Sequence, residues 1–459
     1  MLLCSRTTHS WAVTSMHKKQ NLKKKIENKV FNFFIDSNDF NGIPLRQISE
    51  EFDIKYSESI EIIKELVKED IISIQSSTNP HIIGFQHYPI EIQLKILEQA
   101  KMDKVSHKKY GEVTIAFESS EFPICLYPSN NYLKANRQLE EFNNELYTKQ
   151  LALGEPHLKP IFFEIEVLER YANDPRFDFK FEDYSGQISC KYDEYDKPIV
   201  RKEDQIFVKT FGLGFDSQNN RLAVVYLRYL KELTEEHQVF WKSKETREPD
   251  CKILKEYHEN TIQGNWTFSY SIFSAFIGEL NCLNELCLLI FDKQIFRKSY
   301  DNENRPREFT FFFTPTLKNY NDFVLLLDKM LSDNINKDFF KGEIELFELN
   351  EIEDGLVEKK HKGTIRLFEE WLLKVYNVAD ETIIKDLFKP LKKIRRERQN
   401  PAHRISENVY DKRYIEKQKE MTSDAYSSIR AFRTIFQQHP KAKGYEVPDW
   451  LDNGEVKTF

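Results

Sequence analysis

Residues 384–404, IKDLFKPLKKIRRERQNPAHR, decide the fold of the C-terminal part of this chain. Apolar side chains recur in it every three or four positions, which is the spacing of one helix face; they are Ile384, Leu387, Leu391 and Ile394. Arg398 occupies the next position on that face. A guanidinium directed at a helix interface is costly unless it has an anionic partner, lines a cleft or lies at a subunit contact. The stretch therefore predicts a packed helix whose end carries a charged functional group.

The same spacing continues on both sides of this helix and predicts an all-α bundle of four or five helices over residues 317–439. We expect helices at 317–334, 363–376, 380–400 and 410–438. Their seams include Ile365, Phe368, Leu372 and Val375 in one helix, and Met421, Ala425, Ile429, Phe432 and Phe436 in another. Residues 440–459 carry Pro448 and Gly454 without a helical repeat, so they are predicted to form a tail.

The N-terminal part also has helical periodicity, but extended runs follow it. Three apolar stripes predict three short helices; they are Ile26, Val30 and Phe33, then Leu45, Ile48 and Phe52, then Ile60, Ile63 and Val67. Extended runs at 71–74 and 82–85 flank a turn at Asn79-Pro80 and predict a hairpin. This order over residues 21–88 resembles the winged helix-turn-helix superfamily. Residues 1–20 are expected to be a disordered N-terminus.

The partner of this predicted winged helix is left open between DNA and protein. In a winged helix that binds DNA, the third helix enters the major groove. Residues 55–70 carry three lysines against five acidic side chains, which phosphate would repel. A lysine run at 18–29 could grip phosphates beside the groove, or it could be a solvated helix face.

Between these two parts, residues 89–316 predict a central α+β domain with a sensory or regulatory role. Alternating apolar residues predict strands at 113–117, 163–167 and 177–181, and a hairpin of 206–211 with 222–227. Helices are expected at 134–153 and 271–291. Gly212-Leu213-Gly214 lacks the third glycine and the lysine of phosphate-binding loops, so it predicts a bulge or turn. No ligand for this domain is indicated.

Composition agrees with a multidomain α+β protein and excludes several classes. A chain of 459 residues with 40% hydrophobic and 31% charged residues can bury cores, which excludes a disordered or collagen-like chain. The net charge of −7 gives no overall positive field, so any nucleic-acid binding must come from a local patch. Each part therefore has to be considered for its own chemistry.

Location and metal binding can be addressed from the same sequence. Six cysteines occur without a Cys-x-x-Cys spacing, and the histidines lack the spacing of metal ligands, so we expect no metal, no cofactor and a reducing cytoplasm. No apolar core of a signal peptide is present near the N-terminus. The apolar run 271–291 contains Glu279 and Glu285, which predicts a buried helix without membrane contact.

Residues 391–404 form the one constellation that carries chemistry. Its cations surround the amides Gln399 and Asn400, as phosphate recognition requires; they are Lys392, Lys393, Arg395, Arg396, Arg398 and Arg404. Asn400-Pro401 ends or kinks the helix and brings His403 near Arg398. A histidine can move the proton of a ribose hydroxyl, and an arginine can stabilise the added phosphorane charge. The pair suffices for metal-independent RNA cleavage to a cyclic phosphate.

Arg398-Gln-Asn-Pro-Ala-His403, late in an α-helical bundle, resembles the HEPN ribonuclease motif, an arginine and a histidine four to six residues apart. The likeness covers residues 317–439. It implies a metal-independent endoribonuclease, common in bacterial toxins and anti-phage defence, whose two subunits form one composite cleft. It also implies that Arg398 and His403 are catalytic and that Gln399 or Asn400 supports them. Arg396 has a permitted spacing too.

Two alternatives remain beside this interpretation. Arg433 and His439 also fit the motif, but they lack the basic cluster and the amides, which indicates a chance match. The whole chain could instead be a non-catalytic winged-helix regulator that binds DNA and dimerises through its C-terminal bundle. Otherwise we expect an RNA substrate and a homodimer.

Overall fold

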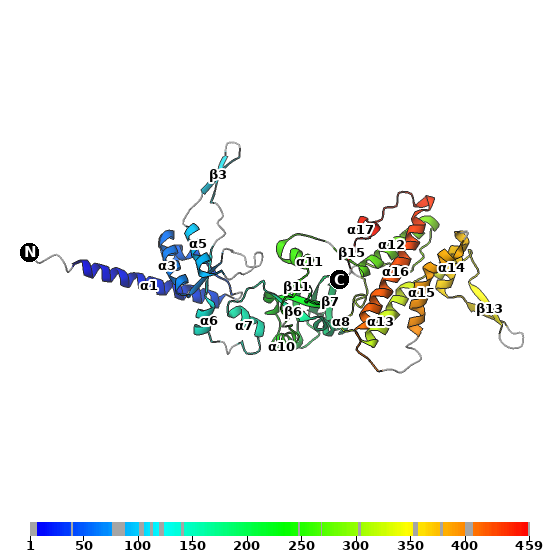
Figure 1. The fold of residues 1–459 in the computed structure, drawn as a ribbon, viewed down its shortest axis with the longest axis horizontal. Helices are drawn as coiled ribbons and strands as arrows, with labels where there is room; N and C mark the ends of the chain where they lie inside the picture. The colour runs from blue at the N-terminus through cyan, green and yellow to red at the C-terminus, as the bar shows by residue number, and fades with distance from the viewer. Residues whose placement is uncertain are drawn as a thin grey trace, which may run out of the picture. The chain divides into compact units, whose positions relative to one another are not determined.

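The computed structural model describes residues 7–37, 40–75, 88–100, 105–110, 113–118, 124–138, 142–246, 248–267, 269–301, 304–351, 357–376, 380–399 and 407–457 (Figure 1). It is an α+β protein with a central antiparallel sheet region and a C-terminal helical region. Two compact units divide the chain. The first comprises Met1–Phe163, Ser189–Gly214 and Val224–Asn265, and the second comprises Glu164–Ile188, Phe215–Ala223 and Trp266–Phe459.

The N-terminal part of the first unit packs helices against a small sheet. Its helices are α1 (Thr7–Asp36), α2 (Leu45–Glu51) and α3 (Tyr56–Lys68), and its strands are β1 (Ile43–Pro44), β2 (Ile72–Gln75) and β5 (Cys125–Pro128). The strand order is β1-β5-β2, with Leu126 opposite both Ile43 and Ile74 in antiparallel register. The helix α1 begins within the stretch expected to be disordered. The predicted strand at 82–85 lies outside the described residues.

The core of this part follows the predicted stripes closely. Ile26, Val30, Ile60, Ile63 and Val67 are at most 1% exposed, and Phe33 and Phe52 pack at the edge of the same cluster. The helix α3 also buries Ile62 and Leu66, because the sheet and α5 (Ile90–Gln99) cover a wider face of it than one stripe requires. A hairpin of β3 (Val105–Tyr110) and β4 (Val113–Glu118) follows.

The central sheet region has the strand order β6-β10-β9-β8-β7, and β11 (Lys252–Ile253) pairs with β9. The strands are β6 (Pro160–Glu164), β7 (Phe177–Glu182), β8 (Ser185–Cys190), β9 (Phe207–Phe215) and β10 (Arg221–Tyr226). The hairpin of β9 and β10 is confirmed, and its turn is held by Asp216 Oδ1, which accepts hydrogen bonds from the backbone N–H groups of Gln218 and Asn220 at 2.8 Å.

Two elements of this region differ from the prediction. The strand expected at 163–167 ends at Glu164, because Ile165–Leu168 turns into a 3-10 helix that buries Val167 and Leu168 on one side. The helix expected at 134–153 is two short helices, α6 (Asn130–Asn136) and α7 (Leu146–Ala152). The backbone of Arg137 is extended and ends α6.

Gly212 lies inside β9, where a side chain would collide with a neighbour, and it is not part of a turn. A Cβ atom on Gly212 would lie 2.1 Å from Cγ of the buried Tyr257. We expect Gly212→Ala to lower the free energy of unfolding by about 1–3 kcal/mol, the usual cost of overpacking a core. Guanidinium titration measures this loss. The same substitution in a Tyr257→Leu background should cost much less, and equal costs in both backgrounds would contradict the proposed collision.

The C-terminal helical region contains helices at the four places expected there, α13 (Leu317–Asp328), α14 (Thr364–Val375), α15 (Glu381–Gln399) and α16 (Arg413–Gln437). It also includes α12 (Ile272–Phe291), which the sequence analysis assigned to the central domain. The helices α12 and α16 pack along each other, and α15 contacts α13, α14 and α16. The chain continues from α13 through one π-helical turn, Lys329–Asp333. A hairpin of β13 (Phe347–Glu351) and β14 (Val357–His361) precedes α14.

The buried face of α15 differs from the prediction at one residue. Ile384, Leu391 and Ile394 are buried as expected. Phe388 is fully buried in place of the half-buried Leu387, because the Phe388 ring packs 4.7 Å from Phe432 and 5.1 Å from Phe368. In α14, Ile365, Phe368 and Leu372 are buried as expected, but Val375 at the helix end is 40% exposed. All five predicted seam residues of α16 are buried.

The segment after residue 440, predicted as a tail, is folded onto the helices up to Lys457. It contains a 3-10 turn (Pro440–Ala442), α17 (Asp449–Asp452) and β15 (Val456–Lys457), which pairs in parallel with β12 (Tyr270–Ser271). Leu451 is completely buried, and the Trp450 ring stacks on Tyr270 at 3.7 Å. Local sequence gives no sign of this because the contacts are made with distant residues.

Of the described helices, α12 is the one whose length and composition would suffice to cross a membrane. Buried core helices pass the same test. Glu279 in the middle of α12 is completely buried and forms an ion pair with Arg433 of α16. This contact explains how the helix accommodates a carboxylate among apolar side chains.

Candidate functional site

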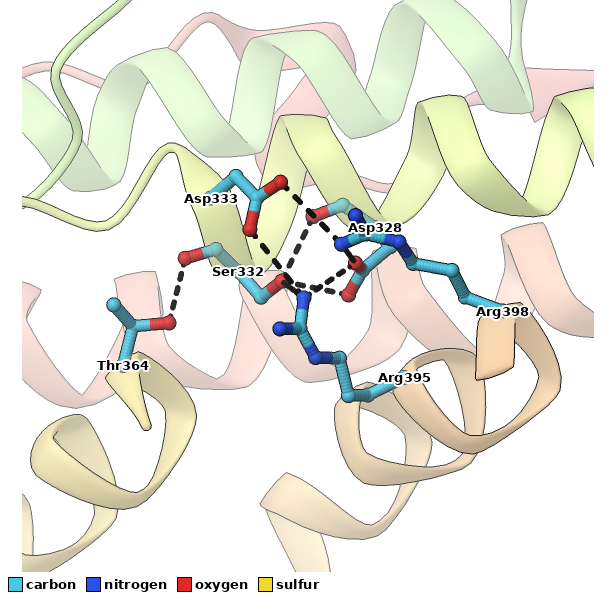
Figure 2. A network of polar contacts seen from close by, with 6 residues as sticks. All are labelled: Asp328, Ser332, Asp333, Thr364, Arg395 and Arg398. Carbon is cyan, nitrogen blue, oxygen red and sulfur yellow. Dashed lines mark hydrogen bonds and ion pairs between the residues drawn. The ribbon is translucent and has the colours of Figure 1, made fainter. Parts of the chain in front are cut away.

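A buried carboxylate at the end of α13 is the centre of the candidate site. Asp328 is the last residue of α13, and its side chain is 1% exposed. Its Oδ1 accepts a hydrogen bond from Ser332 Oγ at 2.6 Å, within the π-helical turn that follows. The hydroxyl of Thr364, the first residue of α14, donates to the Ser332 carbonyl at 2.6 Å (Figure 2). The turn therefore holds the carboxylate in a fixed position.

Arg395 and Arg398 extend from α15 to this carboxylate (Figure 2). Arg395 Nη1 donates to Asp328 Oδ2 at 2.7 Å and to Ser332 Oγ at 3.0 Å, and it lies 3.3 Å from Asp333 Oδ1. Arg398 Nη1 also donates to Asp328 Oδ2, and it lies 3.4 Å from Asp333 Oδ2. Of the three situations expected for Arg398, namely an anionic partner, a cleft or a subunit contact, the structure shows the anionic partner.

Arg398 keeps both its charge and part of its surface in this arrangement. Its hydrogen bond with Asp328 is the main reason why the pKa of the guanidinium is raised above its usual value, although burial opposes the effect. The side chain is 28% exposed. Within the described residues, its hydrogen bonds all leave from Nη1. Nε and Nη2 can therefore donate to an anion that approaches from solvent.

Most of the other predicted cations on α15 are paired within the bundle. Lys392 Nζ lies 2.7 Å from both carboxylate oxygens of Glu369 on α14. Lys393 Nζ lies 2.7 Å from Glu420 Oε1 on α16, and this contact raises the Lys393 pKa. Arg396 is exposed and forms no ion pair within the described residues. The cluster is therefore much less positive than its sequence indicates.

The remaining predicted site residues are only partly placed. Gln399 is the last residue of α15 and is exposed. Asn400, His403 and Arg404 lie outside the described residues. Of the predicted site residues, the structure therefore brings Arg398 together with Arg395.

Asp328, Ser332 and Asp333 are the residues that sequence reasoning missed. Asp328 is 67 positions from Arg395 in the sequence, so no local motif joins the two. A usable signal did exist, because Asp328 is four positions after the buried Val324 and so falls on the buried face of α13. A carboxylate on a buried helix face needs a cation, and α15 supplies two.

Arg433, which with His439 gives the second match to the motif, has a structural role. Arg433 is 1% exposed, its Nε and Nη2 donate to Glu279 at 2.8 and 3.0 Å, and its Nη1 donates to Asp452 at 2.9 Å. His439 Nδ1 accepts a hydrogen bond from the backbone N–H of Lys441 at 3.2 Å. The contacts of Arg433 hold α12, α16 and α17 together, so its guanidinium is not available to a substrate.

The lysines of α1 are directed largely at acidic residues of the same unit. Lys19 Nζ lies 2.6 Å from Glu65 of α3, and Lys23 Nζ lies 2.5 Å from Glu69, the residue that follows α3. Lys29 Nζ lies 2.7 Å from Glu51 on α2. The positive charges of these lysines are therefore partly neutralised within the protein itself.

The described residues give little support for a metal site or for a reactive thiol. It contains no cluster of three histidine, cysteine or acidic side chains suited to a metal ion. Burial raises the pKa of the Cys125 thiol to about 11 and that of Cys287 well above its usual value. Thiols with such pKa values are protonated at neutral pH and are poor nucleophiles.

Comparison with known proteins found no relative of this chain. No family model matches the chain, and neither a curated protein nor a solved structure gives a match.

Proposed function

We propose that this protein is a metal-independent endoribonuclease of HEPN type, with Arg398 and His403 as its catalytic residues. The observation that carries the proposal is the state of Arg398, which Asp328 holds through Nη1 while more than a quarter of the side chain stays exposed. A guanidinium fixed at one nitrogen is oriented in advance, and its other donors can stabilise charge that develops in a transition state. The proposal includes a cytoplasmic role in bacterial defence or as a toxin.

In the proposed reaction, His403 takes the proton of a ribose 2′-hydroxyl as the oxygen attacks the adjacent phosphorus. Arg398 donates hydrogen bonds to the phosphorane oxygens, which carry more negative charge than the phosphate did. The 5′-oxygen then leaves and takes up the proton that His403 has removed, and the other product ends in a 2′,3′-cyclic phosphate. Gln399 or Asn400 supports this pair, and a second copy of the chain supplies the opposite wall of the cleft.

For the N-terminal part, we propose a winged-helix-like arrangement that contacts protein. The order α1, β1, α2, α3, β2 and the position of β5 between β1 and β2 support this fold. Lys19 and Lys23 pair with Glu65 of α3 and with Glu69 directly after it, which favours a protein partner over DNA. The helix that would enter the major groove is acidic, and the nearest lysines are already used in ion pairs, so little positive charge remains for phosphate.

RNA cleavage by the purified full-length protein in EDTA tests the ribonuclease proposal. We expect Arg398→Ala and His403→Ala each to lower the cleavage rate by at least about 100-fold, the usual effect of removing a charge stabiliser or a proton-transfer group. Products of the wild-type protein should carry cyclic phosphate ends. Equal cleavage by wild type and both variants would assign the activity to a contaminant and remove the proposal.

Two matched variants separate catalysis from folding. Arg395→Ala removes the other guanidinium from Asp328 but lies outside the permitted motif spacing, so it should retain most of the activity. Arg396→Ala tests the alternative spacing and should also remain active. If Arg395→Ala were as inactive as Arg398→Ala, the loss would reflect the fold around Asp328, and Arg398 would have no special role.

A further inference from the structure

A second basic site lies at the start of α16 and is separate from the arginine pair. An open groove of about 690 Å³ is formed by the turn of the β9–β10 hairpin and the first turns of α16. Its charged lining residues are Arg221, Lys412, Arg413, Glu416 and Lys419. Four cations therefore face one carboxylate in a groove that is open to solvent.

The lysines of this groove differ from those of α15 in how far acidic side chains neutralise their charge. Lys412 and Lys419 are both exposed, and neither lies within ion-pair distance of a described carboxylate, although Asp216 of the hairpin turn interacts electrostatically with Lys412. Lys392 and Lys393 on α15 each lie 2.7 Å from a carboxylate oxygen. The groove therefore retains positive charge that an anion can neutralise, whereas the predicted cluster has largely been neutralised by the protein itself.

The two arginines of the groove each contact a neighbouring side chain. The Arg221 guanidinium lies 4.5 Å from the centroid of the Phe311 ring, a cation–π contact. Arg413 Nε donates to both oxygens of Asp411, at 2.7 and 3.0 Å. Apolar contact surface comes from Phe215 and Ile415, which also line the groove. Cations beside apolar surface are typical of sites that follow a nucleic-acid strand.

We propose that this groove binds phosphate groups and that, in the ribonuclease proposed above, these belong to the backbone of the RNA strand. The inference rests on that function for the identity of the ligand, and on the groove for its chemistry. Each lysine that neutralises a phosphate of a single strand should contribute about 0.7 to the slope of log affinity against log salt concentration. The groove thus gives affinity, and Arg398 with His403 gives cleavage.

The test measures binding of a fluorescent single-stranded RNA to the full-length His403→Ala protein in EDTA at several salt concentrations. We expect the added substitutions Lys412→Ala and Lys419→Ala to weaken binding about tenfold at low salt and to reduce the salt slope by about 1.4. The matched control is Lys385→Ala with Lys389→Ala, two exposed lysines near the start of α15 that do not line the groove. The control should bind RNA like the parent protein.

A second arm uses inorganic tripolyphosphate, which shares only the phosphate chemistry. Binding of RNA alone that depends on Lys412 and Lys419 supports the backbone assignment. Binding of tripolyphosphate alone with the same dependence keeps the phosphate site but assigns it to a small ligand. If neither ligand depends on these lysines, or if the control weakens binding equally, the groove proposal is overturned.

The two proposals fail in different ways. If the protein binds RNA through the groove but never cuts it, the ribonuclease proposal is wrong and the groove proposal stands. If cleavage needs Arg398 and His403 but keeps its wild-type rate and affinity after Lys412→Ala and Lys419→Ala, the groove proposal is wrong and the ribonuclease proposal stands.

Discussion

Replacing Arg433 by methionine is expected to lower the free energy of unfolding by about 3–5 kcal/mol, the usual cost of removing one partner of a buried ion pair. Arg433 and Glu279 are 1% and 0% exposed, and two hydrogen bonds join the guanidinium to the carboxylate. Without Arg433, the Glu279 carboxylate would remain inside the helical region with no cation. Guanidinium titration of the full-length protein measures the loss.

A double substitution and an exposed pair provide the controls for this prediction. Glu279→Gln combined with Arg433→Met removes both charges, and it should recover much of the stability because no uncompensated charge remains. Arg413→Met on the same helix removes a guanidinium that is 85% exposed and paired with Asp411, and it should leave the unfolding midpoint unchanged. A small effect of Arg433→Met would show that water reaches Glu279.

Asp328→Asn is expected to lower the free energy of unfolding by about 2–3 kcal/mol, because hydrogen bonds to charged groups are stronger than those between neutral groups. Two guanidiniums and the Ser332 hydroxyl converge on this buried carboxylate. Solvent screens the half-exposed arginines, which keeps the loss below that of a fully buried pair. RNA cleavage should fall as well, because Arg398 loses the group that orients it.

Asp333→Asn is the matched control for Asp328→Asn. Asp333 lies beside the same two arginines at 3.3 and 3.4 Å, but its side chain is 47% exposed. Its substitution should therefore change stability and cleavage much less. Equal effects of the two substitutions would mean that the arginines respond to total negative charge, and that the position of Asp328 has no special importance.

The parts of the fold that sequence predicted are those that depend on local periodicity. The helices of the C-terminal region and the β9–β10 hairpin were found because burial on one face repeats with the period of the element. Phe388 was missed in favour of Leu387 because both lie close to the same helix face. The choice between them depends on Phe368 and Phe432, which belong to other helices.

Only the part of the candidate site that lies on α15 could be predicted from the sequence. Arg398 was singled out by its place on the seam of one helix, and its need for an anion followed from that place. The identity of that anion depends on how α13 packs against α15, and no spacing within either helix encodes this packing. For the same reason, the pairing of Lys392 with Glu369 and of Lys393 with Glu420 was not foreseen.

The parallel pairing of β15 with β12, together with the burial of Leu451, has a consequence for biosynthesis. The strand that precedes α12 has no partner until Val456 and Lys457 have been synthesised, so this region cannot complete its core before that point. A nascent chain therefore exposes part of α12 until this segment has emerged from the ribosome. If the ribonuclease activity proposed above requires the complete core, the message being translated is protected until then.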